Sequence, residues 1–581
     1  MVIFFGGSIF VHELGHYLAA KSRKFYIPRF SIGFGPKLFS WKHGETEFRI
    51  SLLPFGGYVA LPQLAEMKEI EGEFDIPKGF KKPSCMDKII AASMGVIFNM
   101  IFAFVLASII WVVGCEKPGS SMTNVIGYVH EKIWIKDDLK VKGPAYKAGL
   151  LPGDKVLSID GKQVRTHFDL MNYIVLGTNR SLDDKPLARL QVERNGSVFD
   201  VDVYPELVMK NEAAGDYMRT IGVEMAQKLI VHEVFKNSPG EKAGLQNGDI
   251  LLKIDDQDIF SLSQLNHILQ STNKPHSLLV QSGNESKSLR LDPMTIPVKK
   301  PYVKLQFDDC FMEIYPDYAE GTKLSNLFDD KVICKLLEYK HLSNTYRDIT
   351  PGSRLMAVNS KEIETMADLV FILKNTKSPQ LRFMTKKGLV REVSYGNIKN
   401  LELVQPERVN SIGVLFSEGT RMVHCNPVSQ LLDSVRNTLI TLNSLISRKS
   451  NVALKNLMGL PGIVKTLNMF ALCDFRLFLL FIITLNVNLA VLNILPIPFL
   501  DGGHIMMAVA EKIMGKNLSG RLTTAVQFLF MVLLMLLMVY VSFFDIRRIF
   551  GDHDNDVKAE KLLNLQVPVQ ALWEGMASAN E

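Results

Sequence analysis

The sequence has no Cys-x-x-Cys pair and no large excess of one charge, and each absence removes a class of function. The six cysteines stand apart from one another, so cysteine-based zinc ribbons and redox motifs are excluded. Cys310 and Cys334 either form a disulfide or stay free thiols, depending on the compartment. The 66 basic and 60 acidic side chains leave a formal charge of +6 with no basic patch, which gives no reason to expect a nucleic-acid partner.

The N-terminal apolar run also lacks the small-residue cleavage pattern of a signal peptide. It is more typical of the end of a first transmembrane helix, which we expect over residues 1–20. Eleven residues precede His12, and eleven helical residues rise about 17 Å, little more than half of a hydrocarbon core. We therefore expect the helix to begin upstream of this sequence.

What the chain does have is apolar sequence in long uncharged stretches, and 47% of its 581 residues are hydrophobic. Three stretches without formal charge, 89–113, 477–500 and 522–544, reach the roughly 20 residues that a bilayer requires. With the N-terminal segment they predict about four spans, over residues 1–20, 88–114, 476–510 and 521–545, followed by a C-terminal tail over 546–581. The long segment between the second and third spans has ordinary soluble composition.

The first predicted span carries three ionisable residues in apolar surroundings. His12 and His16 lie one helical turn apart, so both imidazoles can reach a single zinc ion. Glu13 lies beside them, where a carboxylate can take a proton from a metal-bound water. Ionisable residues inside a membrane are costly unless they bind something, so the cluster predicts a metal site.

A further carboxylate stands near the other end of the chain. Within the third predicted span, Asp501 follows a stretch that Pro496 and Pro498 interrupt. Irregular backbone at membrane depth is tolerated only where it is buried in protein or lines a wet cavity. A two-histidine site needs a third protein ligand if zinc is to keep a position open for water, and Asp501 is the natural candidate. His504 is either a spare ligand or a polar contact.

The segment between the first two spans is basic and then rich in β-forming residues. We expect residues 21–87 to form a basic loop on the cytoplasmic side and a membrane-associated β-hairpin. The edge of this hairpin either pairs with an unwound substrate or only packs against the membrane domain. In the second span, Asn99 either joins two helices or contacts the metal site.

The soluble segment contains an internal repeat. Residues 144–161 and 239–256 align without a gap at an offset of 95 residues, which is too long for a solenoid and right for two small domains. Both copies resemble the PDZ domain, and a weaker third copy has Ser353 in place of an aspartate. The predicted units cover residues 120–208, 218–295 and 303–405. Their grooves either capture extended peptides by strand addition or stay empty in a rigid spacer.

Together these motifs resemble the site-2 protease family, in particular the bacterial branch typified by the regulator-of-sigma-E protease. The motifs are His-Glu-Leu-Gly-His, Phe-Ser-Ile-Gly-Phe-Gly, Pro-Phe-Gly-Gly-Tyr, the tandem repeats and Asn-x-Leu-Pro-x-Pro-x-Leu-Asp-Gly-Gly. The resemblance implies one zinc ion held by His12, His16 and Asp501, with Glu13 activating water. It also implies that substrate is positioned by a further set: Asn488, Asn493, Pro496, Pro498, Gly56, Gly57 and Tyr58. The second span departs from the family pattern Gly-Pro-x-x-Asn, because it reads Gly-Val-Ile-Phe-Asn at 95–99.

The predicted fold is a multi-domain membrane protein with an α-helical transmembrane metalloprotease core and inserted α/β PDZ-like domains. Residues 427–470 are expected to be amphipathic helices on the membrane surface. The expected activity is hydrolysis of a peptide bond in or near the transmembrane segment of a single-span membrane protein, such as an anti-sigma factor or a leftover signal peptide. The other expected partners are extended peptides at the PDZ grooves and the lipid bilayer.

The expected location is the bacterial inner membrane, with the repeats in the periplasm and the site near the cytoplasmic side. Lys512, Lys516 and Arg521 fit this topology, whereas Arg547 and Arg548 fit less well. The alternative function is a non-catalytic, membrane-anchored PDZ scaffold with a structural metal. A metal transporter is disfavoured because the spans show no inverted repeat.

Overall fold

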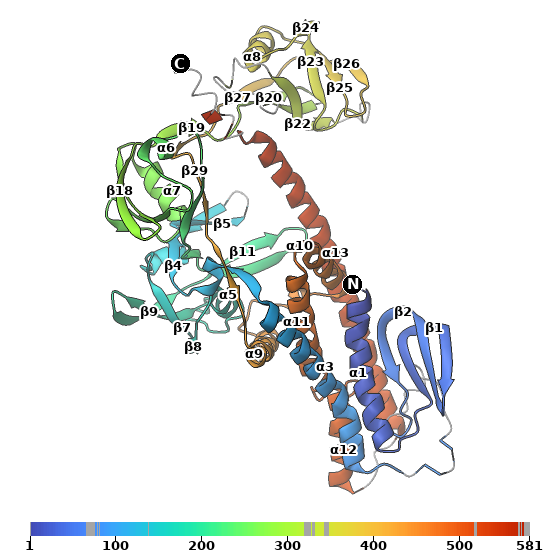
Figure 1. Cartoon of the computed structure of the whole chain (residues 1–581). Helices are drawn as coiled ribbons and strands as arrows, with labels where there is room; N and C mark the ends of the chain where they lie inside the picture. Colours follow the sequence, from blue (N-terminus) through green and yellow to red (C-terminus); the bar gives the residue numbers. More distant parts are fainter. Residues whose placement is uncertain are drawn as a thin grey trace.

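The computed structural model describes residues 2–64, 76–77, 79–80, 82–136, 139–308, 310–318, 327, 332–341, 348–515, 520–567, 570 and 572–573. Figure 1 shows an elongated molecule. Long helices and a hairpin form one end, and β-rich units form the other.

The helical end is built around one central helix. Its members are α1 (Val2–Ser22), α3 (Cys85–Val113), α11 (Phe475–Asn493), α12 (Asp501–Met514) and α13 (Gly520–Leu565). α1, α11 and α12 each pack on α3, whose buried positions include Ala91, Gly95 and Ala103. Small residues of this kind let helices approach closely in a membrane. Among the described residues, three helical segments are long and apolar enough to cross a bilayer, 85–113, 475–493 and 523–552; α1, predicted as a span, is not one of them.

The segment expected as one span over 476–510 consists of two helices, α11 and α12, joined by a turn. Pro496 and Pro498 lie in this turn, where their missing N–H groups break the helical ladder. The turn folds tightly onto the start of α12, because a Cβ at Gly502 or Gly503 would collide with the carbonyl oxygens of residues 494, 495 and 497. The two glycines therefore let the turn pack directly on the first residues of α12, beside Asp501.

The hairpin lies against α1. Its strands are β1 (Arg29–His43) and β2 (Thr46–Val59). Phe30 of β1 pairs with Phe48 on one side and with Val59 on the other, so β2 folds back and places residues 57–59 at an edge. β2 also packs against α1. This edge is the part of the hairpin that approaches the candidate site.

The first two β-rich units share one order of elements. The first contains β4 (Ile126–Val129), β5 (Lys132–Lys136), β6 (Leu139–Lys142), α4 (Pro144–Lys147), β7 (Lys155–Ile159), β8 (Lys162–Gln163), α5 (His167–Val175), β9 (Ala188–Arg194), β10 (Ser197–Val203), the hairpin β11 (Glu206–Asn211) and β12 (Asp216–Thr220), and β13 (Val223–Met225). The second contains β14 (Leu229–Val234), α6 (Pro239–Ala243), β15 (Ile250–Ile254), β16 (Gln257–Asp258), α7 (Leu262–Ser271), β17 (His276–Ser282), β18 (Glu285–Leu291) and β29 (Val414–Ser417). In each, the last strand pairs with the first, β13 with β4 and β29 with β14.

These pairings correct the predicted unit boundaries. The first unit does not end at 208, because β13 closes it. The second does not end at 295, because its closing strand β29 lies more than a hundred residues further along the chain. The third unit is inserted into the second on a two-stranded stem, β19 (Met294–Pro297) paired with β28 (Arg408–Ser411). After β29, β30 (Thr420–Val423) pairs with β3 (Cys115–Pro118), just after α3, and a short 3-10 turn, η1 (Gly119–Met122), follows β3.

The third unit has the same kind of helix and hairpins around a larger sheet. Its elements are β20 (Tyr302–Gln306), β21 (Cys310–Asp317), β22 (Ile333–His341), β23 (Arg354–Val358), β24 (Lys361–Glu362), α8 (Met366–Lys374), β25 (Gln380–Met384), β26 (Val390–Ser394) and β27 (Asn400–Val404). Ser353 accepts a hydrogen bond from the N–H three residues earlier, at 3.2 Å. Asp154 and Asp249 do the same in the other units, at 2.8 and 2.9 Å. The serine therefore replaces the aspartate in the same turn.

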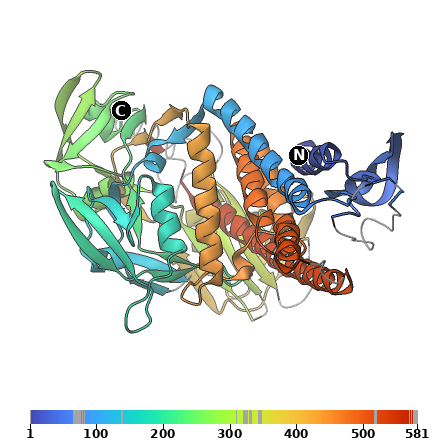
Figure 2. The ribbon, with the colours of Figure 1, turned by 90° about the horizontal axis from the view of Figure 1, so that it is seen from below.

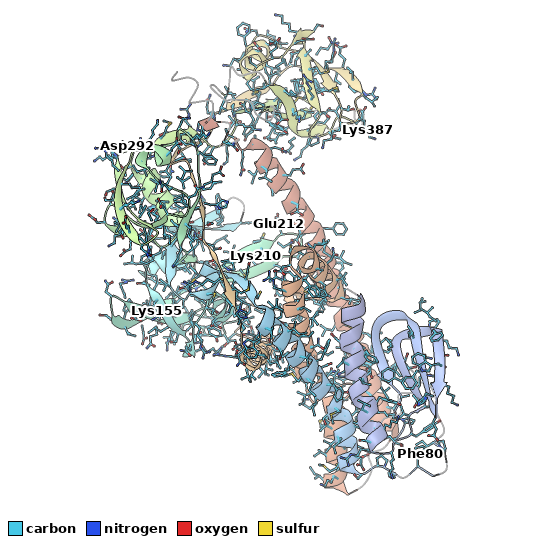
Figure 3. All side chains as sticks on the ribbon, viewed as in Figure 1. Phe80, Lys155, Lys210, Glu212, Asp292 and Lys387 are labelled. Atoms are coloured by element: carbon cyan, nitrogen blue, oxygen red, sulfur yellow. The ribbon has the colours of Figure 1, made fainter. Side chains whose placement is uncertain are left out.

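Two more helices connect the units to the helical end. α9 (Pro427–Ile446) packs on α3 and α11; it is seen end-on in Figure 1 and lies crosswise to these helices in Figure 2. α10 (Leu460–Cys473) follows a short turn, η3 (Leu454–Asn456), and packs on α13. α13 continues to Leu565, so the tail predicted to begin at 546 is helical in its first part. Figure 3 shows Lys210 and Glu212 on the β11–β12 hairpin, close to this helix.

Candidate metal centre

The imidazoles of α1 form one half of the site. His12 and His16 are both buried, and their Nε2 atoms lie 3.2 Å apart. The rings meet edge to face, at a centroid distance of 4.7 Å. Two unprotonated ring nitrogens pointing at each other repel, so this arrangement is favourable only with a cation or proton between them.

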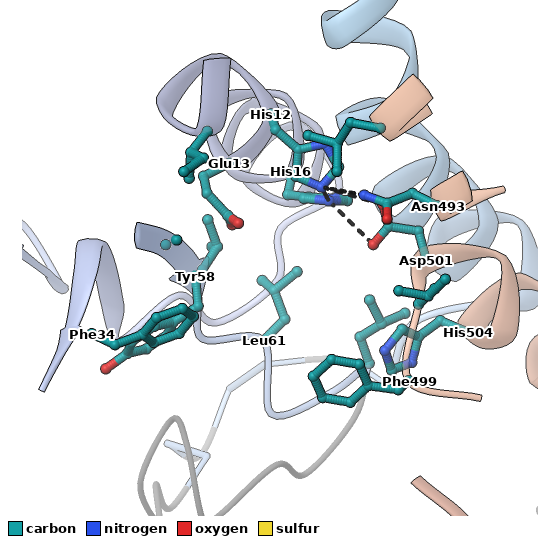
Figure 4. A pocket seen from close by; sticks show the side chains of 17 residues that line it. His12, Glu13, His16, Phe34, Tyr58, Leu61, Asn493, Phe499, Asp501 and His504 are labelled. Carbon is teal, nitrogen blue, oxygen red and sulfur yellow. Dashed lines mark hydrogen bonds and ion pairs between the residues drawn. The ribbon is translucent and has the colours of Figure 1, made fainter. Parts of the chain in front are cut away.

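Asp501, at the start of α12, forms the other half. Its Oδ2 lies 3.3 Å from Nε2 of His12 and its Oδ1 lies 3.4 Å from Nε2 of His16. Oδ2 is buried and makes no hydrogen bond among the described residues. Figure 4 shows the carboxylate facing both imidazoles across the gap between α1 and α12.

The three side chains fit a tetrahedral ion. A regular tetrahedron with ligand bonds of about 2.05 Å, as zinc makes to nitrogen and oxygen, has edges of about 3.3 Å. The two Nε2 atoms lie 3.2 Å apart, and they lie 3.3 and 3.4 Å from the two different oxygens of the Asp501 carboxylate, so the side chains are spaced close to such an edge. Over the described part of the chain, His12, His16 and Asp501 are the one set of three such residues whose ligand atoms all lie within 4.8 Å of each other. Three donors leave the fourth corner free for water or substrate.

Groups around the imidazoles fix which nitrogen faces the gap. Nδ1 of His16 lies 2.8 Å from the carbonyl oxygen of Ala91 in α3, to which it donates when Nε2 binds a metal. Asn99 of α3 lies 3.0 Å from Nδ1 of His12 through its amide nitrogen, and its Oδ1 is buried without a partner. Rotating the amide by half a turn presents Oδ1 to a proton on Nδ1. Of the two roles considered for Asn99, the structure shows contact with the site.

Removal of the Asn99 side-chain amide should weaken zinc binding without abolishing it. We expect Asn99→Ala to lower zinc affinity by about 10–100-fold, as loss of a group that orients a ligand histidine typically does. Competition with a zinc-binding dye measures it. Asn486→Ala is the matched control, because Asn486 is also buried in a helix but donates to Ser8 instead. Equal affinities in the two variants would show that Asn99 only packs.

Gly95 of α3 faces the imidazoles directly. A Cβ at this position would collide with Nε2 of His16 and approach Cε1 of His12. In the sequence, Gly95 stands one helical turn before Asn99, but nothing there explains why a glycine is needed. The reason is the space that the two histidines occupy.

Glu13 lies on the side of the site that faces the hairpin. Its carboxylate accepts a hydrogen bond from the backbone N–H of Val59, and a Cβ at Gly57 would press against its side chain. A cavity of about 300 Å³ connects the three metal-binding candidates, Glu13 and the hairpin residues Gly56, Gly57 and Tyr58. Phe34 stacks on Tyr58 at a centroid distance of 6.2 Å, so the hairpin wall is aromatic.

The other predicted site residues divide into two groups. Asn493 lines the cavity, with its amide 3.3 Å from Nε2 of His12, and His504 lines it too. Asn488 accepts a hydrogen bond from Thr438 of α9 at 2.5 Å, which places it at a helix contact. Pro496 and Pro498 shape the turn before α12 and are not among the described residues that line the cavity.

Sequence reasoning missed the groups that act through their backbone. The carbonyl of Ala91 and the N–H of Val59 orient His16 and Glu13, and neither residue has a side chain that signals such a role.

Fold and site together define a class of membrane protein. Three side chains suited to bind a metal are buried in an apolar cavity, a fourth residue places its carboxylate beside them, and a β-strand edge borders the cavity. Peptidase family M50 matches the chain over residues 1–537, and the chain belongs to this family. The resemblance to site-2 proteases is thereby confirmed, and the chain is a peptidase.

Relatives match almost end to end. A protein of Chlamydia pneumoniae named as a zinc metalloprotease is 26% identical over 644 aligned residues, covering 94% of this chain and 97% of the relative. A protein of Thermotoga maritima with the same kind of name is 26% identical, covering 95% of this chain and 99% of the relative. The regulator of sigma E protease of Haemophilus influenzae is 24% identical, covering 93% and 96%.

Proposed function

We propose that this chain is an intramembrane zinc metalloprotease, with His12, His16 and Asp501 as ligands and Glu13 as the general base. It hydrolyses a peptide bond in or near the transmembrane segment of single-span membrane proteins, such as anti-sigma factors or leftover signal peptides. The observation that carries the proposal is that the two Nε2 atoms lie 3.2 Å apart and that the Asp501 carboxylate comes within 3.4 Å of both of them, with residues from opposite ends of the chain.

The metal that these residues would hold supplies Lewis acidity at the scissile carbonyl. Glu13 takes a proton from the attacking water and passes it to the leaving amine nitrogen, which is the ordinary role of a carboxylate in general acid–base catalysis. The N–H of Val59 keeps the carboxylate turned toward the cavity. Asn493, whose amide reaches the same edge of His12, is placed to donate to a substrate carbonyl.

A helical substrate hides its peptide carbonyls in hydrogen bonds and has to unwind before it reacts. The edge formed by residues 57–59 of β2 lies beside Glu13, and an extended segment can add to such an edge as a further strand. Gly56 and Gly57 carry no side chain that would block the approach. This supports the hairpin as the element that holds the unwound segment.

The proposed location is a bacterial inner membrane, with the β-rich units in the periplasm and the metal centre toward the cytoplasmic side. The positive charges that follow α1 and α12 support this orientation. Arg548, which seemed to oppose it, pairs with Asp216 at 2.5 Å and with Asp545 at 2.7 Å. Because this arginine is neutralised within the protein, it carries little weight as a topology signal.

Metal removal tests the proposal. We expect a zinc chelator to abolish cleavage of a single-span substrate by the protein in detergent or bilayer discs, and one equivalent of zinc to restore it. The measurement is product formation on a gel together with the metal content of each sample. A membrane-anchored scaffold would instead show no cleavage in any sample, and peptide binding that does not depend on zinc.

A further inference from the structure

The C-terminal end of the chain returns to the most distant unit. α13 leaves the helical end and runs to the third unit (Figure 1). Beyond it, the backbone pairs with the linker that leads into that unit. The N–H of Lys300 donates to the carbonyl of Leu565 at 2.6 Å, and the N–H of Val567 donates to the carbonyl of Val298 at 3.1 Å. Gln566 and Lys299 form the antiparallel bridge between these bonds.

Four apolar side chains of this C-terminal segment are buried to the degree of core residues. Leu565, Val567, Leu572 and Trp573 are 5%, 4%, 3% and 1% exposed. Val567, Leu572 and Trp573 belong to the hydrophobic core of the third unit, which also includes Phe235 of the second unit and Ile296 of the stem. Leu565 packs with Tyr315 and Leu337. The segment therefore fills the junction of the second unit, the stem and the third unit.

The wall around the segment is shaped for it. Gly413, directly before β29, has a φ of +66°, and a Cβ there would collide with Cβ of Ser238 and lie 3.0 Å from the ring of Trp573. Tyr315 of the third unit lies near Glu560 of α13, and burial raises the pKa of this tyrosine to about 12. A side chain at 413 would therefore disturb both Ser238 and the docked Trp573.

The third unit also lacks the free edge at which the second unit can accept a peptide. In the second unit, β29 pairs with β14 and is the last strand of its sheet. In the third unit, β21 takes the corresponding place beside β22, and β20 and then β27 are added beyond it. An external peptide therefore cannot add at β21, because the chain's own strands already occupy that position.

From these observations we infer that the third unit is an anchoring unit whose partner is the chain's own C-terminal segment, through residues 565–567, 572 and 573, rather than an external peptide. The first unit is fixed to the same helix through Arg548, whose guanidinium joins Asp216 of the β11–β12 hairpin to Asp545 of α13. Asp545 in turn accepts from the N–H groups of Gly459 and Gly462 at 2.8 and 2.9 Å. α13 thus connects the first and third units to the membrane part. This inference is independent of the metal site.

Hydrogen exchange on the full-length protein tests the docking. Deletion of residues 565–581 removes the carbonyl that accepts from the N–H of Lys300, so it should speed exchange of this amide at least tenfold. The amides of Val298 and Lys299, which donate to Glu407, and strands β15 and β17 of the second unit should stay protected. A synthetic peptide of residues 565–581 added to the truncated protein should restore protection of the Lys300 amide, and a scrambled peptide should not. Zinc content should be the same with and without the segment.

Point variants separate docking from helix length. We expect Leu572→Ala with Trp573→Ala to reproduce the effect of the deletion, and Leu563→Ala, at a position 62% exposed on α13, to leave exchange unchanged. Unchanged exchange of the Lys300 amide after deletion would overturn the inference. Failure of the peptide to restore its protection in the truncated protein would overturn it too, whether β21 and β22 remain protected or not.

Discussion

Glu13→Gln is expected to lower the rate of substrate cleavage by about 10²–10⁴-fold, the usual contribution of a general base, while zinc stays bound at one ion per chain. Glutamine has the shape of glutamate, and its amide oxygen can still accept from the N–H of Val59, so the side chain keeps its place. What it loses is the ability to take a proton. Single-turnover cleavage and metal analysis of the same sample measure the two effects.

Glu511→Gln is the matched control for this variant. Glu511 also lies in the helical end, where it pairs with Lys88 at 2.7 Å, but it is on the far end of α12 from Asp501. The control should keep activity within about twofold, since partly exposed ion pairs contribute little to stability. Full activity of Glu13→Gln would refute the assignment of the base. Loss of zinc from it would place Glu13 among the metal ligands.

Gly95→Ala is expected to weaken zinc binding although residue 95 carries no ligand atom. The added methyl group would occupy the position of Nε2 of His16, and both imidazoles would have to move. Overpacking of this kind costs about 1–3 kcal/mol, which corresponds to a 5–150-fold loss of zinc affinity at roughly 1.4 kcal/mol per factor of ten. Titration with zinc under competition measures the change, and cleavage at limiting zinc should fall with it.

Gly7→Ala in α1 provides the control for a new methyl group in a helix. A Cβ at Gly7 meets nothing within 4 Å, and alanine favours helix over glycine by about 1 kcal/mol. This variant should bind zinc as the parent does. If Gly95→Ala also kept its affinity, the imidazoles would have room that the structure does not provide, and the close approach of α3 would not matter for the metal.

The local features of the site could be predicted from the sequence, because they depend on residue type and helical period. The one-turn spacing of His12 and His16 and the broken helix before Asp501 are both visible in the printed residues. The choice among the asparagines was less successful. Asn488 is five residues before Asn493, so it points about 140° away from it around the helix, and it contacts α9. The helical period alone would have separated these two asparagines.

The larger arrangement could not be predicted, because it depends on strand pairing between distant segments. The repeat marks β7 and β15 clearly, but the strands that close the units, β13 and β29, lie outside it. The insertion of the third unit separates β29 from β18 by more than a hundred residues, and no local pattern indicates that they share a sheet. Likewise, Leu572 and Trp573 gave no sign in the sequence of a place in the core of another unit.

The contacts of α3 determine which wall of the cavity is able to yield. Cys85 donates from its thiol to the carbonyl of Ala508 at 3.2 Å, and Lys88 pairs with Glu511, so α12 is attached to α3 below the metal centre. At the metal centre itself, Ala91 and Asn99 of α3 contact the ring nitrogens of His16 and His12 and so hold α1 against α3. The three ligands thus belong to one preassembled frame. We therefore expect movement of the cavity to be largest at the opposite wall, which is formed by hairpin residues such as Gly57 and Tyr58.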